Sequence, residues 1–288
     1  MKILLTRGIA MCMLMFLFAA CSKKSWDEFY ETPSTLDKPI YTVLQEKGNF
    51  SQLLSVINKA GYKTTLDAAG YWTFFAPDDD AFKAYFTEKG ISGVDQLDSA
   101  QCRNIVTYSL VYYAYNKERL SDYNSSTGWV DNLGFRRRTA NYTGVYDATD
   151  YSGTQMKAIA NNRNGTTDYV TADYNYKYIP YFTTDFMETQ GLSSYDYEYL
   201  YPGTSYTGFN VMDATVTEQD INAQNGVIHV VDKVIEALPS IDQYLEDASD
   251  YSLFNSLYQK YFVSYVYNST VSSNYNLING GSSQVYVK

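Results

Sequence analysis

The sequence predicts an α+β fold in which buried strands pack against amphipathic helices. Two strands are indicated by the aromatic-rich run 72–76 and by the β-branched run 227–231, because both are apolar at nearly every position. A helix is indicated from Phe50 to Ala60, where large apolar residues recur at helical spacing. Gly61 follows this stretch and is a natural end for a helix.

The first strand is expected to run into a second helix. Pro77 cannot donate a ladder hydrogen bond and therefore ends the strand. Asp78 is then a good N-cap, and the carboxylates of residues 78–80 face the positive end of the helix dipole. A calcium loop needs an oxygen ligand at its fifth position and a glutamate at its twelfth, but Phe82 and Lys89 stand there. We therefore expect these carboxylates to cap helices, and we expect no metal site.

The second strand is preceded by Asn225-Gly226, a strong turn signal because both residues tolerate a positive φ. His229, the only histidine of the chain, lies in the middle of this strand. A catalytic or metal-binding histidine needs partners, and the sequence offers no second histidine or cysteine pair. We interpret His229 as part of the scaffold, and we expect no catalytic residues and no cofactor.

The segments Trp72–Phe82 and Asn225–Ile235 resemble the two signature boxes of the fasciclin domain, a cell-surface adhesion and binding module. The resemblance implies a fasciclin-like β-sandwich or wedge with packed helices, and a binding scaffold without a catalytic set. It also implies a scaffold histidine at the position of His229. Between the boxes, Tyr108-Ser109 stands where many members carry Tyr-His. The adhesive roles proposed for that pair therefore do not transfer directly to this chain.

The charge of the chain excludes a class of partners. The formal net charge is −10, and phosphate contacts need clustered lysine and arginine. The one basic cluster, Arg136–Arg138, is expected to be a solvated strand end. We therefore expect no nucleic-acid partner.

The N-terminus predicts an anchor to a membrane. Residues 1–20 read as a signal peptide whose apolar run is too short to span a bilayer. The sequence then resembles a bacterial lipobox ending at Cys21, which would be acylated, with residues 21–37 as a tether. An ordinary secretory leader is the alternative. The expected location is the outer membrane of a Bacteroidetes-like envelope, on its periplasmic or its surface face.

The chain also repeats itself at an offset of 201 residues. Six positions of residues 40–57 match six of residues 241–258 in type, including Leu53 with Phe254. We therefore expect a fasciclin-like domain over residues 38–238 and an incomplete second copy over residues 240–288. The tail from Asn268 is rich in Ser and Asn and is expected to be loose.

A tyrosine-rich insertion is expected at about residues 125–208. Two runs within it alternate strictly, and period two would place each run on one face of a strand. The runs are Tyr174, Tyr176 and Tyr178, and Tyr195, Tyr197, Tyr199 and Tyr201. Such a face either covers the core or forms an exposed platform for a ligand. These seven tyrosines are the candidate ligand platform.

The features together predict a non-enzymatic lipoprotein that acts as an adhesion or ligand-binding module, in an accessory role to glycan uptake. A polysaccharide or an outer-membrane protein is the expected partner. One alternative is a purely structural subunit of a protein assembly. Another is a polysaccharide-active hydrolase, although no pair of carboxylates stands out by motif. Ser99, in Asp98-Ser99-Ala100, is a candidate O-glycosylation site, and it also stands where a helix can begin.

Overall fold

The two apolar segments of the sequence form neighbouring strands at the centre of the fold. In the computed structural model, which describes residues 37–68, 70–160 and 176–288, β1 (Trp72–Pro77) and β11 (Gly226–Val231) pair in parallel. Trp72 lies opposite Gly226, and Pro77 lies opposite Val231. The two signature segments, 154 positions apart at Trp72 and Gly226, are therefore in direct contact.

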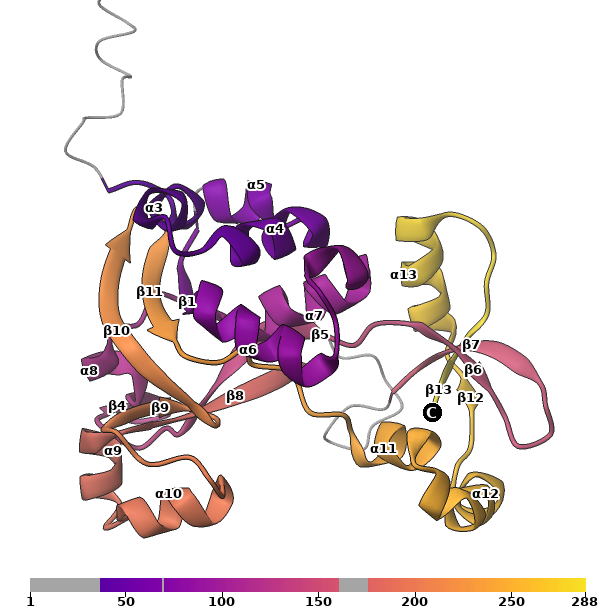
Figure 1. The fold of residues 1–288 in the computed structure, drawn as a ribbon. Coiled ribbons are helices and arrows are strands. Elements are labelled where there is room, and N and C mark those ends of the chain that lie inside the picture. The colour runs from indigo at the N-terminus through magenta and orange to yellow at the C-terminus, as the bar shows by residue number, and fades with distance from the viewer. Residues whose placement is uncertain (1–36, 69, 161–175) are drawn as a thin grey trace, which may run out of the picture. The chain divides into compact units, whose positions relative to one another are not determined.

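Seven strands of the described residues close into a barrel in the order β1-β11-β10-β9-β8-β5-β2 (Figure 1). The remaining members are β2 (Leu110–Tyr112), β5 (Arg136–Tyr142), β8 (Tyr176–Thr183), β9 (Phe209–Val211) and β10 (Ala214–Ala223). All pairs except β1 with β11 are antiparallel. The sheet of the expected sandwich or wedge is thus closed on itself, which removes its edges.

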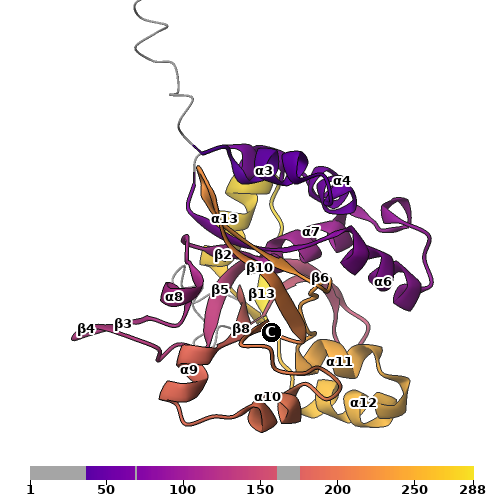
Figure 2. The same cartoon turned by 60° about the vertical axis from the view of Figure 1, so that its left-hand side comes forward.

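Helices cover one side of β1 and β11 (Figures 1 and 2). They are α3 (Ile40–Lys47), α4 (Ser51–Ala60), α5 (Lys63–Asp67), α6 (Asp79–Lys89) and α7 (Ser99–Ser109), with a short 3-10 turn at Val94–Gln96. A further short helix, α8 (Lys117–Leu120), follows β2. The predicted helix from Phe50 to Ala60 is confirmed as α4, and Gly61 ends it with a φ of 75°.

The central strands are apolar at successive positions because both of their faces are buried. Phe74 and Ile228 point toward the helices and belong to the core beneath α4, α6 and α7. The alternate residues, Phe75 and Val231, belong to a second core on the barrel side. Side chains of a strand alternate between its faces, so a strand between two cores shows no polar alternation. The same physics explains why these two runs were the clearest signals in the sequence.

The range 125–208, expected to be an insertion, contributes two barrel strands, β5 and β8, as well as additional elements. These are the hairpin of β3 (Tyr123–Ser125) and β4 (Gly128–Val130), the strands β6 (Tyr146–Thr149) and β7 (Gln155–Ile159), and the helices α9 (Thr184–Thr189) and α10 (Ser194–Leu200). Residues 161–175 lie outside the described part.

The C-terminal segment repeats the first helix pair and then joins a small sheet. It contains α11 (Ile241–Asp247), a 3-10 turn at Ser249–Tyr251, α12 (Ser252–Tyr261), β12 (Val266–Tyr267), α13 (Ser269–Asn279) and β13 (Val285–Val287). Both α11 and α12 begin 201 residues after α3 and α4. β13 pairs in parallel with β7 and antiparallel with β12. The tail that was expected to be loose is therefore structured, because Asn268 caps α13 and β7 supplies a partner strand.

The two helix pairs differ in what covers them. Leu53 on α4 is 1% exposed, whereas its counterpart on α12, Phe254, is 57% exposed. Ile40 is fully buried, and its counterpart, Ile241, is 81% exposed. The second helix pair has the sequence pattern of the first, but within the described residues no strands and helices bury it as they bury the first pair.

Candidate functional site

The acidic triplet after β1 ties three elements together. The Asp78 carboxylate accepts a hydrogen bond from the backbone N–H of Ala81 at 2.9 Å and so caps α6. Asp79 reaches across to α4, where its carboxylate accepts from the backbone N–H groups of Ser51 and Gln52 at 3.1 and 2.8 Å. Within the described part of the chain, no group of three or more His, Cys, Asp or Glu side chains is placed to hold a metal ion. The predicted capping role is confirmed for Asp78 and Asp79, and Asp79 caps a helix other than its own.

Asn225 holds the second signature segment to the helices. Its side-chain oxygen accepts from the backbone N–H of Ile40 at 2.8 Å. Its amide nitrogen donates to the carbonyl oxygens of Leu66 and Ala68 at 2.9 and 2.6 Å. Asn225 is fully buried, so these three bonds satisfy backbone groups that water cannot reach.

The turn at this point differs from the expected one. Ala223 pairs with Gly226, so the loop residues are Gln224 and Asn225, and neither Asn225 nor Gly226 has a positive φ. Glycine is required at position 226 for another reason. A Cβ added there would lie 2.0 Å from the carbonyl oxygen of Trp72. The close approach of β1 to β11 therefore selects glycine.

Asn225→Asp should lower the free energy of unfolding by about 3 kcal/mol, because a buried donor is replaced by an oxygen that faces two carbonyl oxygens. The shape of the side chain is unchanged, so packing does not account for the loss. Urea denaturation at pH 7 measures the effect. Gln224→Glu is the matched control, since it makes the same change on the adjacent exposed side chain and should alter stability by less than about 0.5 kcal/mol. Equal midpoints for the two variants would contradict the role given to Asn225.

His229 is buried in a defined tautomer. Its Nε2 donates to the carbonyl oxygen of Tyr115 at 3.0 Å, and its Nδ1 accepts from the backbone N–H of Asp220 at 3.2 Å. The ring stacks on Phe75, with a centroid separation of 5.6 Å, and meets the edge of Phe209. Burial lowers the pKa of His229 below its ordinary value. The imidazole is therefore neutral, and its two hydrogen bonds connect β11 to Asp220 on β10 and to Tyr115, in keeping with the scaffold interpretation.

The stability of the protein should fall as the pH drops below about 6.5, the ordinary pKa of histidine. Because the folded-state pKa is lower, the unfolded state binds more protons between the two values, and acid favours unfolding in that range. The loss between pH 7.5 and pH 5.5 should reach up to about 1.4 kcal/mol. Chemical denaturation at both pH values measures it. His229→Gln should remove this slope, and an unchanged slope in that variant would contradict the assignment.

Tyr108 and Ser109 lie inside the fold. Tyr108 is 4% exposed, and its hydroxyl donates to the carbonyl oxygen of Tyr178 at 3.2 Å. Ser109 is buried, and no described residue forms a hydrogen bond with its hydroxyl. Neither side chain is presented to a partner, so the family's Tyr-His position is a packing position in this chain.

The two described tyrosines of the first run lie on a strand as expected, but their rings already contact arginine side chains. Tyr176 and Tyr178 are half-buried on β8, and Tyr174 lies outside the described residues. The guanidinium of Arg136 lies 5.4 Å from the centroid of the Tyr178 ring, and that of Arg138 lies 5.1 Å from the Tyr176 ring. These rings bind arginines of the neighbouring strand β5, so they do not form an open platform.

The arginine cluster is likewise part of the fold. It opens β5, as expected of a strand end, but two of its three side chains are half-buried. Arg137 lies 4.2 Å from the centroid of the Tyr115 ring and donates from Nε to the carbonyl oxygen of Leu120 at 2.9 Å. These contacts replace the solvated state that the charge pattern suggested.

The second tyrosine run was wrongly predicted to be a strand, because residues 194–200 form the helix α10. Tyr197 is fully buried, and its hydroxyl donates to the carbonyl oxygen of Met212 at 2.9 Å. Tyr195 and Tyr199 are 73% and 76% exposed, and Tyr201 packs beside Tyr197. The run is therefore divided between two faces of a helix and does not form one platform.

A capping box explains the helix. Ser193 and Asp196 cap each other's backbone, as serine and an acidic residue do three positions apart. An alternation over seven residues also places its members four apart, and such residues are neighbours on a helix. Period two thus fits both structures over a short run. The Ser193–Asp196 pair was the signal that distinguishes them.

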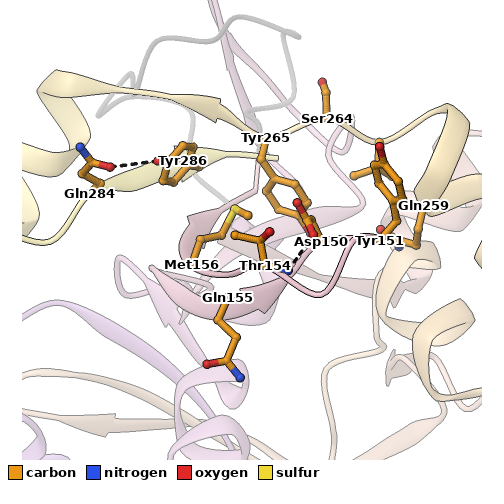
Figure 3. A pocket seen from close by; sticks show the side chains of 11 residues that line it. Asp150, Tyr151, Thr154, Gln155, Met156, Gln259, Ser264, Tyr265, Gln284 and Tyr286 are labelled. Carbon is orange, nitrogen blue, oxygen red and sulfur yellow. Dashed lines mark hydrogen bonds between the residues drawn. The ribbon is translucent and has the colours of Figure 1, made fainter.

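The described residues form an open pocket of about 560 Å³ between the β6–β7 connection and the C-terminal segment (Figure 3). Tyr151 and Asp150 come from the β6–β7 connection. Tyr265 and Gln259 come from α12 and the chain that follows it, and Tyr286 lies on β13. A volume of this size is in the range of small-ligand sites. The pocket combines aromatic rings with amide and hydroxyl groups.

The described lining of the pocket is polar and carries one charged side chain. Among the described residues that line it, Asp150 is the one carboxylate, and none is a lysine or an arginine. The Oδ1 atom of Asp150 accepts from the backbone N–H groups of Ser152 and Thr154 at 2.8 and 2.9 Å. Hydrogen bonds from Ser152 and Thr154 lower the pKa of Asp150 below its usual range. The carboxylate is therefore ionised and held in one orientation by its own turn.

Known proteins support the relation suggested by the two boxes. A fasciclin domain model matches residues 48–167 and 180–237, which is more than half of the 288 residues. The chain belongs to the fasciclin domain family. Among solved structures it is similar to the FAS1 domain pair of fasciclin I, an insect cell adhesion molecule, at 14% identity and a TM-score of 0.31. That similarity covers 81% of this chain, which spans 64% of the other chain's length.

Fasciclin domains occur in adhesion proteins such as that insect molecule. The pocket extends beyond the fasciclin match. Asp150 and Tyr151 lie inside the matched range, whereas Tyr265, Gln284 and Tyr286 lie after it. Sequence reasoning missed the pocket because its two walls are more than 100 residues apart. Tyr151 lies in the tyrosine-rich range 125–208 but belongs to neither alternating run.

Two further candidate residues concern modification. Ser99 is exposed and is the first residue of α7, with Asp98 as the N-cap in a capping box with Gln101. Cys21 lies outside the described residues. No helix of the described part is long and apolar enough to cross a bilayer.

Proposed function

We propose that this fasciclin-family chain is an envelope lipoprotein, anchored through an acylated Cys21, that binds polysaccharide in an accessory role to glycan uptake. The observation that carries the binding part of the proposal is the open pocket lined by Tyr151, Tyr265 and Tyr286. Aromatic rings beside amides and hydroxyls suit sugars, whose C–H faces are apolar and whose rims are polar. The Cys21 lipobox and the leader support the location in the outer membrane.

The pocket favours binding over hydrolysis. Glycoside hydrolysis uses two carboxyl groups across the sugar, one of which is protonated to act as an acid. Asp150 is the one carboxylate among the described residues that line the pocket, and its lowered pKa keeps it ionised at neutral pH. It cannot supply the proton of the acid step. We therefore propose retention of the polysaccharide without cleavage.

Affinity electrophoresis of the full chain in detergent, through gels containing soluble polysaccharides, tests the binding. At least one polysaccharide should retard the protein, and incubation with it should release no new reducing ends. Migration unaffected by every polysaccharide would contradict the binding role, and release of reducing ends would instead support the hydrolase.

The anchor is tested separately. Mass spectrometry of the protein from a lipoprotein-processing bacterium should show acyl groups on an N-terminal Cys21, and Cys21→Ser should move the protein from the membrane fraction to the soluble fraction. Recovery of wild-type protein without acyl groups would contradict the anchor.

A second candidate function, assembly into a larger structure, is favoured by the exposed face of α11 and α12. Ile241, Leu253, Phe254 and Phe262 are 81%, 74%, 57% and 80% exposed on this helix pair. Contiguous exposed apolar residues mark interaction surfaces. We propose a second copy of the chain as the occupant, because two identical apolar faces are complementary about a twofold axis.

Light scattering at several concentrations tests this assembly. The full chain in detergent should show a dimer that Leu253→Asp converts to a monomer, whereas Tyr199→Asp, an equally exposed site on α10, should leave the dimer intact. A wild-type protein that is monomeric at every concentration would exclude the second copy.

A further inference from the structure

Among the tyrosines that line the pocket, Tyr265 has a cation beside its ring. Tyr265 is half-buried, and the ammonium of Lys288 lies 5.9 Å from its ring centroid. Lys288 is itself fixed, because it forms ion pairs with Asp242 at 2.7 Å and with Glu246 at 3.0 Å. Burial opposes the charge on Lys288, but these two carboxylates raise its pKa above the ordinary value. The Tyr265 ring is thus a pre-organised surface, which lowers the entropy cost of binding.

Gln259 and Gln284 each have one hydrogen-bonding group that is used within the protein and one that is available to a ligand. The Gln259 amide nitrogen donates to the carboxylate of Asp242 at 3.3 Å, which leaves its carbonyl oxygen as an acceptor. The Gln284 carbonyl oxygen accepts from the hydroxyl of Tyr286 at 3.0 Å, which leaves its amide nitrogen as a donor. Figure 3 shows Gln259 on one side of Tyr265 and Gln284 on the other side, beyond Tyr286.

Asp150 adds a second acceptor. Its Oδ1 is occupied by the turn, whereas no described residue forms a hydrogen bond with its Oδ2. Acceptors on Asp150 and Gln259, with a donor on Gln284, match groups that both donate and accept. Hydroxyl groups do both, and a sugar carries several of them on one ring.

The charges of the pocket select among sugars. A sulfate or carboxylate on a ligand would meet the Asp150 anion, and the part of the lining that the structure describes offers it no lysine or arginine. The net charge of −10 adds a weaker, longer-range repulsion. Uronic acids and sulfated sugars are therefore disfavoured by both terms.

We propose that the pocket around Tyr265 is a binding subsite for a neutral sugar ring of a polysaccharide. The ring stacks on Tyr265, and its hydroxyls bond to Gln259, Gln284 and Asp150. This inference rests on the proposed polysaccharide binding and specifies its location and its ligand class.

Affinity electrophoresis and calorimetry with the full chain in detergent test the subsite. The ligands are neutral polysaccharides (mixed-linkage β-glucan, mannan, xylan and amylopectin) and anionic ones (polygalacturonate and hyaluronan). Wild-type protein should bind at least one neutral polysaccharide and neither anionic one. Tyr265→Ala should weaken that binding about tenfold or more, as loss of a central aromatic contact does. Tyr199→Ala, an exposed tyrosine on α10, is the matched control and should bind as wild type does.

Gln284→Leu provides a second variant, because this side chain is exposed and its replacement does not disturb the core. It should also weaken binding while leaving the thermal midpoint unchanged. Retention of full neutral-glycan affinity by both variants would overturn the subsite and leave the proposed function standing. Preference for the anionic polysaccharides would overturn the ligand class. Absence of wild-type binding to every polysaccharide would overturn this inference and the proposed function together.

Discussion

Gly226→Ala should abolish cooperative folding or lower the free energy of unfolding on the order of 4 kcal/mol or more. The new Cβ would lie 2.0 Å from the carbonyl oxygen and 2.9 Å from the carbonyl carbon of Trp72. Both atoms belong to backbone and cannot rotate away. To make room for the Cβ, β1 and β11 would have to separate where Trp72 pairs with Gly226. Both strands lie between the two cores, so this separation would also disturb the packing.

Thermal and urea denaturation measure this effect. Gly93→Ala is the control, because its added Cβ would have no neighbour within 4 Å and its backbone is extended with a φ of 163°. The control should differ from wild type by less than about 1 kcal/mol. If Gly226→Ala melts as the control does, the parallel contact of the two signature segments is not as close as described.

Leu53→Asp should unfold the domain at 25 °C. Leu53 is 1% exposed, on the face of α4 that packs into the helix-side core. The substitution loses about 1.5–3 kcal/mol of apolar burial. It also buries a carboxylate without a partner, at a cost of several kcal/mol. Together these terms are comparable with the whole stability of a typical domain, about 5–15 kcal/mol.

The internal repeat supplies a matched control for this variant. Phe254 is the counterpart of Leu53 on α12, but it is 57% exposed. Phe254→Asp should therefore change the melting temperature of the monomer by no more than about 3 °C. Circular dichroism melts of both variants measure the contrast. A cooperative melt of Leu53→Asp at the wild-type midpoint would refute the buried face of α4.

Elements with several concurrent signals were predictable from sequence. The helix α4 combined apolar spacing with a glycine stop, and α6 combined Pro77 with the N-cap at Asp78. Each signal is local, because the end of a helix or strand and the buried face of a helix set requirements that residues within a few positions satisfy. The strands β1 and β11 were recognisable because burial on both faces leaves an unbroken apolar run.

The tyrosine runs show where local patterns are insufficient. Residues 195–201 satisfy both a strand period and a helix spacing, and the choice depends on the capping box and on burial of Tyr197 against the chain near Met212. Tyr176 and Tyr178 do lie on a strand, but only the pairing of β8 with β5 brings arginines to their rings. The exposure of a side chain depends on which residues pack against it, and the spacing of residues in the sequence does not identify those residues.

The sequence by itself determined the strand-to-helix box, the strand of the second box, the helix caps, the scaffold role of His229 and the repeated helix pair, because these depend on contacts within a few residues or on composition. Tertiary structure alone decided that Gly226 is needed for a close approach, that Asp79 caps α4, and that Tyr265 meets Asp150 in a pocket. Those features join residues tens to more than 100 positions apart. Their geometry exists only after the chain has folded.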